Sequence, residues 1–242
     1  SIFFLLISQI LVAQNVKKCN TTFLMNNEIE KNEEYLENRK RLIAEDKLWI
    51  NQNSTASNKR STITIPIVVH VIHRTNHANI GSGTNISDAR IEDAIRILNE
   101  DYSKTNPEFP NPPRNTFLSS SGNPNLEFCL ATIDPSGNPT NGITRTATTQ
   151  TNWDADDQGG WGSDGEANAM KKTSSGGIDS WDYQRYLNIW VCDLTNSQSG
   201  GMTLGYAYLP GLPSSSWNDQ TWKDGLVVDF QWFGTIQGAS GD

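Results

Sequence analysis

The chain has 242 residues, 36% of them hydrophobic, and a formal net charge of −8 at pH 7. This length allows one large domain with a leader and argues against two independent cores. A nucleic-acid partner is excluded, because phosphate binding needs a basic surface and no Lys/Arg cluster lies on a predicted face. The eight tryptophans and the many Asn, Ser, Thr and Gly residues favour a loop-rich exported protein.

Residues 1–14 form an apolar run that is too short to span a bilayer comfortably, and polar residues follow at once. The pattern predicts a signal peptide over residues 1–14, with cleavage near Ala13 or Gln14. A buried strand or a membrane anchor is the alternative, which the charged stretch that follows disfavours. We therefore expect a secreted protein with no stable membrane anchor.

Residues 15–60 divide into a charged helical part and a polar linker. Between residues 27 and 48, Ile29, Leu36 and Ile43 recur every seven positions, which predicts a helix with a narrow apolar stripe. Residues 51–60 contain no apolar residue beyond Ala56 and predict a linker. The main domain is expected to start at Ser61.

The rest of the chain alternates strand and helix signals. The β-branched run at 63–72 predicts a central strand that is buried on both faces. Ser87 caps a predicted helix that runs to about Tyr102 and packs on the sheet. Further strands are predicted at 126–133, 186–194, 203–208 and 225–230, with a short helix at 165–172. This is an α+β fold with a mixed five-stranded sheet.

Several sequence runs together are more specific than any one alone: IPIVVHVIHR at 65–74, ISDARI at 86–91, ILNEDY at 97–102, FCLA at 128–131 and YLNIWVCDL at 186–194. Over residues 61–242 the chain resembles the pappalysin-type metalloproteases of the metzincin clan. The resemblance implies a zincin-like upper subdomain, a twisted five-stranded sheet with backing helices, behind a helical pro-segment. It also implies a secreted zinc metalloendopeptidase that acts on proteins or peptides.

In that family the next segment is a zinc helix, His-Glu-x-x-His-x-x-Gly-x-x-His, whose imidazoles chelate the metal. Zinc lowers the pKa of its bound water, and the helix glutamate accepts the proton. This sequence contains no such motif, so the resemblance implies an N-terminal fragment that holds no catalytic residue and is itself inactive.

The three histidines of the chain are His70, His73 and His77. His70 and His73 are three positions apart on a predicted strand, so their side chains leave opposite faces of the sheet. They cannot jointly chelate a metal through that strand, and we expect both to be structural.

The resemblance makes 203–208 the edge strand that binds an extended substrate through main-chain hydrogen bonds. The implied substrate-binding residues are Thr203, Leu204, Gly205, Tyr206 and Ala207. The alternative is an ordinary protected edge, for which Gly205 and nearby Pro210 would be sufficient reason.

Cys19 resembles the pro-segment cysteine with which family members ligate and block the catalytic zinc, since a thiolate is a strong zinc ligand. The family pattern prefers Gly where this chain has Asn20, and an incidental free thiol is the alternative. Cleavage of the linker at Lys59, Arg60 and Ser61 would release the domain without cutting its first strand.

Cys129 and Cys192 lie on strands that the family sheet order separates by the first strand, so we expect two unpaired, buried thiols. The acidic loop at 153–166 has oxygen ligands enough for calcium but lacks EF-hand spacing, and a solvated insertion is the alternative.

A different class of function is a non-catalytic secreted binding module, for example one directed at carbohydrate. Its stacking platforms would be tryptophans in polar loops, namely Trp153, Trp161, Trp217 and Trp222. The same tryptophans can equally be core anchors.

Overall fold

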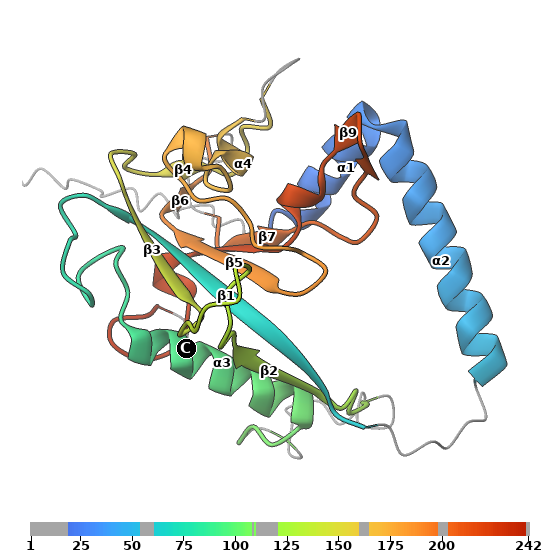
Figure 1. Cartoon of the computed structure of the whole chain (residues 1–242), viewed down its shortest axis with the longest axis horizontal. Helices are drawn as coiled ribbons and strands as arrows, with labels where there is room; N and C mark the ends of the chain where they lie inside the picture. The colour runs from blue at the N-terminus through green and yellow to red at the C-terminus, as the bar shows by residue number, and fades with distance from the viewer. Residues whose placement is uncertain are drawn as a thin grey trace, which may run out of the picture.

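The computed structural model describes residues 19–53, 61–107, 109, 121–159, 165–197 and 203–240. Its centre is a six-stranded sheet (Figure 1). The strands are β1 (Ile63–Arg74), β2 (Leu126–Leu130), β3 (Ile143–Thr148), β5 (Leu187–Cys192), β7 (Gly205–Ala207) and β10 (Leu226–Asp229). The order β2-β1-β5-β10-β7 is the predicted mixed sheet of five strands, and β7 is its antiparallel edge.

β3 is a sixth strand that the sequence pattern did not predict. β2 pairs with the first half of β1, up to Ile67, and β3 pairs in parallel with the second half, from Val69 onward. The run ITRTAT is mostly polar and only partly buried, so its strand character depends on pairing with β1.

β1 is the central strand, as predicted. Its residues alternate between two cores: Ile67, Val69 and Val71 face one hydrophobic cluster, and Val68 and Ile72 face clusters on the other side. All five are almost fully buried, because neighbouring strands and both layers cover β1.

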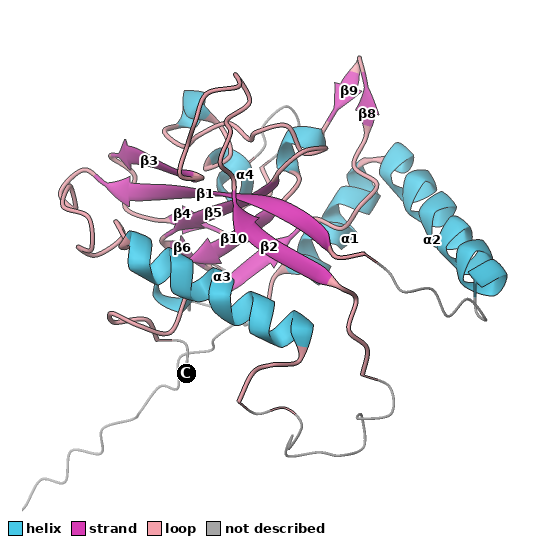
Figure 2. Ribbon diagram, turned by 60° about the horizontal axis from the view of Figure 1, so that its bottom comes forward, coloured by secondary structure: helices cyan, strands magenta, loops and turns pink. Residues whose placement is uncertain are grey.

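The helix α3 (Asp88–Ser103) lies across one face of the sheet (Figure 2). Ser87 caps it as predicted, with its hydroxyl accepting from the Arg90 amide at 3.2 Å. Ile91 and Ile95 bury their side chains against the sheet. The helix ends at Ser103, and the capping residue Lys104 adopts a left-handed conformation with φ of 62°.

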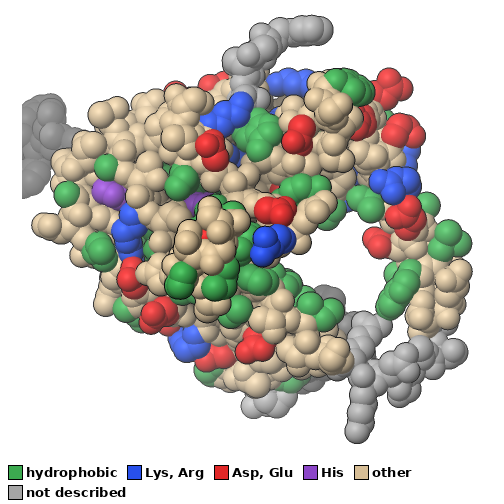
Figure 3. Space-filling model, viewed as in Figure 1, with side chains coloured by type: hydrophobic (Ala, Val, Ile, Leu, Met, Phe, Trp, Pro, Cys, Tyr) green, Lys and Arg blue, Asp and Glu red, His purple; other side chains and the backbone are tan. Residues whose placement is uncertain are grey.

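The predicted N-terminal helix is in fact two helices, α1 (Thr21–Lys31) and α2 (Glu33–Asn53), separated by Asn32 in an extended conformation. The expected apolar stripe is therefore confirmed only in its first part. Ile29 and Leu36 are partly buried and Tyr35 beside them is fully buried, whereas Ile43 is 44% exposed. Only the first turns of α2 contact the body, and its C-terminal half stands away from it (Figure 3).

Shorter elements complete the structure. They are β4 (Trp153–Asp154) paired with β6 (Leu194–Thr195), the hairpin β8 (Ser214–Ser215) with β9 (Asn218–Asp219), α4 (Glu166–Ala169), and the 3-10 turns η2 (Thr173–Ser175), η3 (Thr221–Lys223) and η4 (Phe230–Trp232). The helix predicted at 165–172 is thus only a four-residue turn of helix. Among the helices in the described ranges, none is long and apolar enough to cross a membrane.

Candidate functional site

The edge strand β7 presents one side to its neighbour and the other to the N-terminal segment. Its inner side pairs antiparallel with β10, with Gly205 opposite Val228 and Ala207 opposite Leu226. Glycine is required at 205 because a Cβ there would lie 2.7 Å from the Val227 carbonyl oxygen. β7 therefore packs closely against β10, and the backbone groups on its outer side are left to pair with another chain segment.

The first residue of α1 and the residue before it occupy that outer side. The Asn20 amide donates to the Gly205 carbonyl at 3.1 Å, and the Ala207 amide donates to the Thr21 hydroxyl at 3.0 Å. These two contacts bracket β7 in the manner of a short added strand. The N-terminal segment thus covers the backbone groups that an extended peptide would use.

The five residues expected to bind substrate do not all face this side. Gly205 and Ala207 offer their backbone groups to the N-terminal segment. Thr203 is fully buried against Asn196, and the Leu204 carbonyl accepts from the Asp229 amide at 2.9 Å. The Tyr206 side chain points into the core, where burial raises the pKa of its hydroxyl well above the usual range.

Asn20, the residue that departs from the family pattern, is fully buried at this contact. Its amide nitrogen donates to the Ala155 carbonyl at 2.6 Å and to a carboxylate oxygen of Asp156 at 3.2 Å. Glycine could make neither bond. Asn20 therefore joins β7 to the acidic loop, which explains an amide side chain at this position.

Cys19 lies one residue before this contact and is exposed, with its sulfur 3.4 Å from the Thr21 hydroxyl. No group of three or more His, Cys, Asp or Glu side chains that could hold a metal occurs in the part of the chain that the structure describes. A zinc ion does not fit the side chains present here, and Cys19 could supply it with one ligand only.

The histidines are held by local partners, as predicted. The two ring nitrogens of His70 lie 2.7 Å from the Thr144 hydroxyl and 3.1 Å from the Asn188 side-chain oxygen. Burial lowers the pKa of His70 to about 4, so the ring is neutral at pH 7. His73 lies on the other side of the strand and contacts the Arg74 carbonyl at 3.1 Å.

The first turns of α2 are hydrogen-bonded to the loop that follows β7. Three side chains, Tyr35 (3.0 Å), Asn38 (3.2 Å) and Arg39 (3.1 Å), donate to the carbonyl oxygens of residues 209, 211 and 210 respectively. Glu34 accepts hydrogen bonds from both strands of the β8–β9 hairpin. The loop backbone at 209–211 is therefore satisfied by the N-terminal helices.

A buried ion pair joins α1 to the body. The Lys223 ammonium lies 3.0 Å from the Glu28 carboxylate, and only 7% and 8% of these two residues are exposed. Next to it, the ammonium of the buried Lys171 donates to the Lys223 carbonyl. Burial lowers the pKa of Lys171 to about 7.

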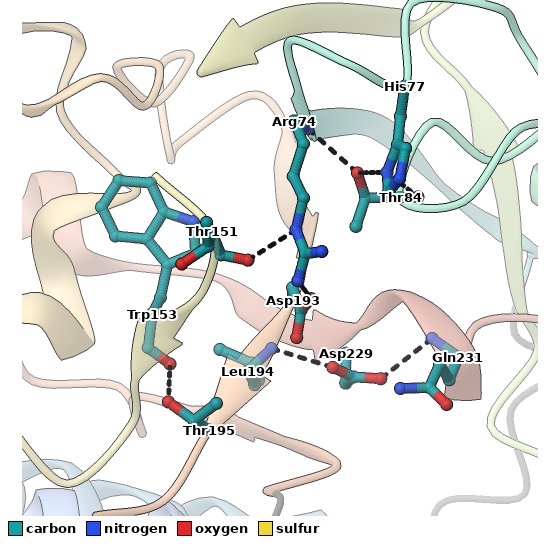
Figure 4. A network of polar contacts seen from close by, with 10 residues as sticks. All are labelled: Arg74, His77, Thr84, Thr151, Trp153, Asp193, Leu194, Thr195, Asp229 and Gln231. Atoms are coloured by element: carbon teal, nitrogen blue, oxygen red, sulfur yellow. Dashed lines mark hydrogen bonds and ion pairs between the residues drawn. The ribbon is translucent and has the colours of Figure 1, made fainter. Parts of the chain in front are cut away.

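A second polar network ties together the carboxyl ends of β1, β5 and β10 (Figure 4). Arg74 is ion-paired with Asp193 and donates to the Thr151 carbonyl at 2.8 Å. Asp229 accepts from the amides of Leu194 (2.8 Å) and Gln231 (2.9 Å), and burial raises its pKa to about 6. All of these groups have protein partners, so we interpret the network as structural.

The three cysteines are free. β1 does lie between β2 and β5, as the predicted separation of Cys129 and Cys192 requires. Cys192 is buried as expected, but Cys129 is only partly buried because β2 is an edge strand. Of the expected cleavage residues, Lys59 and Arg60 lie outside the described residues, and Ser61 is exposed.

The carboxylates of the acidic loop accept backbone hydrogen bonds. Asp154 accepts from the Asp156 amide at 2.9 Å, and Asp157 accepts from the Glu166 amide at 3.0 Å. These bonds brace the loop. Residues 160–164 lie outside the described part, and the calcium site stays a prediction.

The tryptophans expected as stacking platforms differ in their surroundings. Trp153 is a core residue with 2% exposure, whereas Trp217, at the tip of the β8–β9 hairpin, is 80% exposed. The Lys172 ammonium lies 4.1 Å from the centre of the Trp222 ring. Trp161 lies outside the described residues. The four do not form one set of exposed platforms, since Trp153 is an anchor of the core.

Sequence reasoning missed Asn20, Glu28, Tyr35 and Lys223, which hold the N-terminal segment on the body. One feature of the sequence did indicate a buried contact of Glu28. Glu28 follows Leu24 by four residues and shares its helix face, so a carboxylate on an apolar stripe needs a cationic partner. Nothing in the local pattern named Lys223 as that partner.

No family model and no curated protein matches the sequence. Among solved structures, a promirolysin mutant from Tannerella forsythia is 34% identical with a TM-score of 0.67, and the match covers 93% of this chain and 63% of that one. Mature mirolysin from the same organism, in complex with a cleaved peptide, is 38% identical with a TM-score of 0.59, covering 75% and 58%. Mirolysin in complex with compound 9 is also 38% identical, with a TM-score of 0.59.

The chain thus spans roughly three fifths of the length of these proteins, since the matches cover between 57% and 63% of each solved chain. The mixed sheet, its backing helix and the N-terminal helices agree with the fold of promirolysin, as expected for a metzincin-like upper subdomain behind a pro-segment. In sequence and in fold, this chain is similar to mirolysin and to its precursor.

Proposed function

We propose that this chain is the N-terminal part of a secreted zinc metalloendopeptidase precursor of the pappalysin type. The observation that carries the proposal is the placement of Asn20 and Thr21 on the outer side of β7. An edge strand binds an extended peptide through the same backbone groups. A pro-segment that pairs there keeps substrate out, and its removal opens the edge.

The shares of the chain that the comparisons cover have the size that a division into pro-segment and catalytic part would give. Residues 61–242 are 182 of the 242 residues, or 75%, and the match to mature mirolysin covers 75% of the chain. The match to promirolysin extends to 93%. We accordingly assign residues 1–14 to a signal peptide, residues 15–60 to the pro-segment and linker, and residues 61–242 to the upper part of the catalytic domain.

The peptide bound to mature mirolysin supports peptide substrates for this chain as well. In the complete protein, zinc would supply the activated water, with ligands from outside this sequence. The residues of this chain would supply the upper rim: β7 holds the peptide main chain, and β10 holds β7 in place. Cys19, exposed beside β7, would block the metal before activation.

The test uses the full-length precursor, expressed with the natural continuation of its reading frame. Cys19→Ala should shorten the lag before cleavage of a quenched fluorescent peptide, because the thiolate no longer excludes the attacking water. Cys129→Ala, a matched change at a partly buried cysteine of β2, should leave the lag unchanged.

Equal lag times for the wild type and Cys19→Ala would contradict the proposed role of Cys19 in latency. A full-length protein that cleaves no peptide after its linker is cut and its pro-segment has been removed, or a continuation without a closely spaced histidine triplet, would contradict the protease assignment itself.

A further inference from the structure

We propose that Lys223 is a carboxylate-binding subsite next to the substrate-binding edge, filled by Glu28 in the precursor and by an acidic side chain of the substrate after activation. The inference rests on the proposed function and adds a substrate preference to it. The precursor itself shows a carboxylate bound at this place, because Glu28 lies 3.0 Å from the Lys223 ammonium.

The charges around Lys223 leave it dependent on Glu28. Lys171 and Lys223 are both buried. Burial lowers the pKa of Lys171 and raises that of Asp224, and the attraction between these two groups opposes both shifts. Glu28 is the ion-pair partner of Lys223. When α1 leaves, Lys223 loses its carboxylate and the cover that α1 provides, and its ammonium is then open to another anion.

The subsite is built on the body of the protein and not on the pro-segment. Lys223 belongs to η3, where its amide donates to the Gln220 carbonyl at 3.0 Å and its own carbonyl accepts from Lys171. Its ammonium also lies 5.9 Å from the Tyr208 ring centre and 5.5 Å from that of Trp222. These contacts remain after α1 departs, so the ammonium stays in position to bind.

The subsite is within reach of a peptide on β7. In the precursor, Thr21 contacts Ala207, and Glu28 follows it within the same helix. The Lys223 ammonium lies 5.9 Å from the ring centre of Tyr208, the residue that follows Ala207. A substrate that pairs with Ala207 would therefore pass close enough to Lys223 for an acidic side chain a few residues along to reach it.

The test measures kcat/KM of the activated full-length enzyme on a series of peptides in which Glu replaces Gln at one position at a time. At one position, Glu should raise kcat/KM roughly tenfold for the wild type, as expected for a partly desolvated charge pair. Lys223→Gln should abolish the preference, and Lys223→Arg should keep it. Lys172→Gln, a neighbouring cation that contacts Trp222, is the matched control and should also keep it.

A second measurement does not depend on a variant of the enzyme. A synthetic peptide of residues 19–53 should bind the activated wild type about tenfold more weakly when Glu28 is replaced by Gln. A Glu preference that survives in Lys223→Gln, no preference at any position, or equal binding of the two peptides would overturn the inference. Absence of all hydrolysis would instead overturn the proposed function, and this inference with it.

Discussion

His70 and Asp229 are buried titratable groups whose effects on stability oppose each other as pH changes. The folded-state pKa of His70, about 4, lies below its usual 6.5, so its contribution is present above pH 6.5 and is lost as pH falls toward 4. The pKa of Asp229 is raised to about 6, so its ionised form disfavours folding above pH 6 and this cost disappears as pH falls toward 3.8. Both shifts come from burial.

We expect His70→Gln to remove the loss of stability that His70 causes as pH falls. Between pH 7 and pH 5 the unfolded chain protonates His70 and the folded chain does not, which by itself costs the wild type about 2 kcal/mol. The opposing effect of Asp229 remains in the variant, so its stability should rise over this range. Urea denaturation at both pH values measures the difference. His77→Gln, on the loop after β1, should keep the wild-type pH dependence, and an unchanged pH dependence in His70→Gln would contradict the shifted pKa.

At the scale of elements, α3 stabilises the sheet by packing and also by closing its edge. The Asn99 side chain donates to the Phe128 carbonyl at 2.8 Å and accepts from the Phe128 amide at 2.8 Å. A side-chain amide thereby takes the place of a neighbouring strand on the outer side of β2. Edge strands left open pair with other chains, so this contact protects the sheet.

Asn99→Ala should cost about 1 to 3 kcal/mol of folding free energy, because it leaves two backbone groups of Phe128 without their partner. Hydrogen exchange of the Phe128 amide should become faster than in the wild type. Glu92→Ala, at an exposed position of the same helix, should change stability by less than about 0.5 kcal/mol. Unchanged exchange at Phe128 would mean that Asn99 does not close this edge.

At the scale of the whole molecule, the N-terminal helices are attached through side chains to one strip of the body, from β7 to η3. The attachment combines the Asn20 and Thr21 contacts, the Glu28–Lys223 pair and the Tyr35 hydroxyl. None of these depends on the covalent link through residues 54–60. Cleavage of that link should therefore not release the helices at once.

After a trypsin cut at Lys59–Arg60–Ser61, residues up to 53 should stay bound and co-elute with the body in size-exclusion chromatography. Tyr35→Phe should speed their dissociation several-fold, since the buried bond to the Leu209 carbonyl is lost. Tyr102→Phe, the same change on the distant α3, should leave dissociation unchanged. Immediate separation of the cut wild type would contradict this account.

Local pattern was sufficient to predict β1, α3 with its Ser87 cap, and the separate surroundings of His70 and His73. Each follows from periodicity or from a capping side chain within a few residues. β3 could not be predicted in this way, because its polar run becomes a strand only by pairing with β1. The helix break at Asn32 was likewise hidden, since the charged run has high helix propensity on both sides.

The sequence by itself determined the mixed sheet with its backing helix, because strand burial and helix amphipathicity are properties of neighbouring residues. The tertiary structure decided which surface the N-terminal segment covers and which partners Asn20, Glu28 and Tyr35 meet. Those partners lie more than 130 residues away along the chain. The free energy of such contacts depends on a shared buried environment, which exists only once β7, its following loop and η3 have come together.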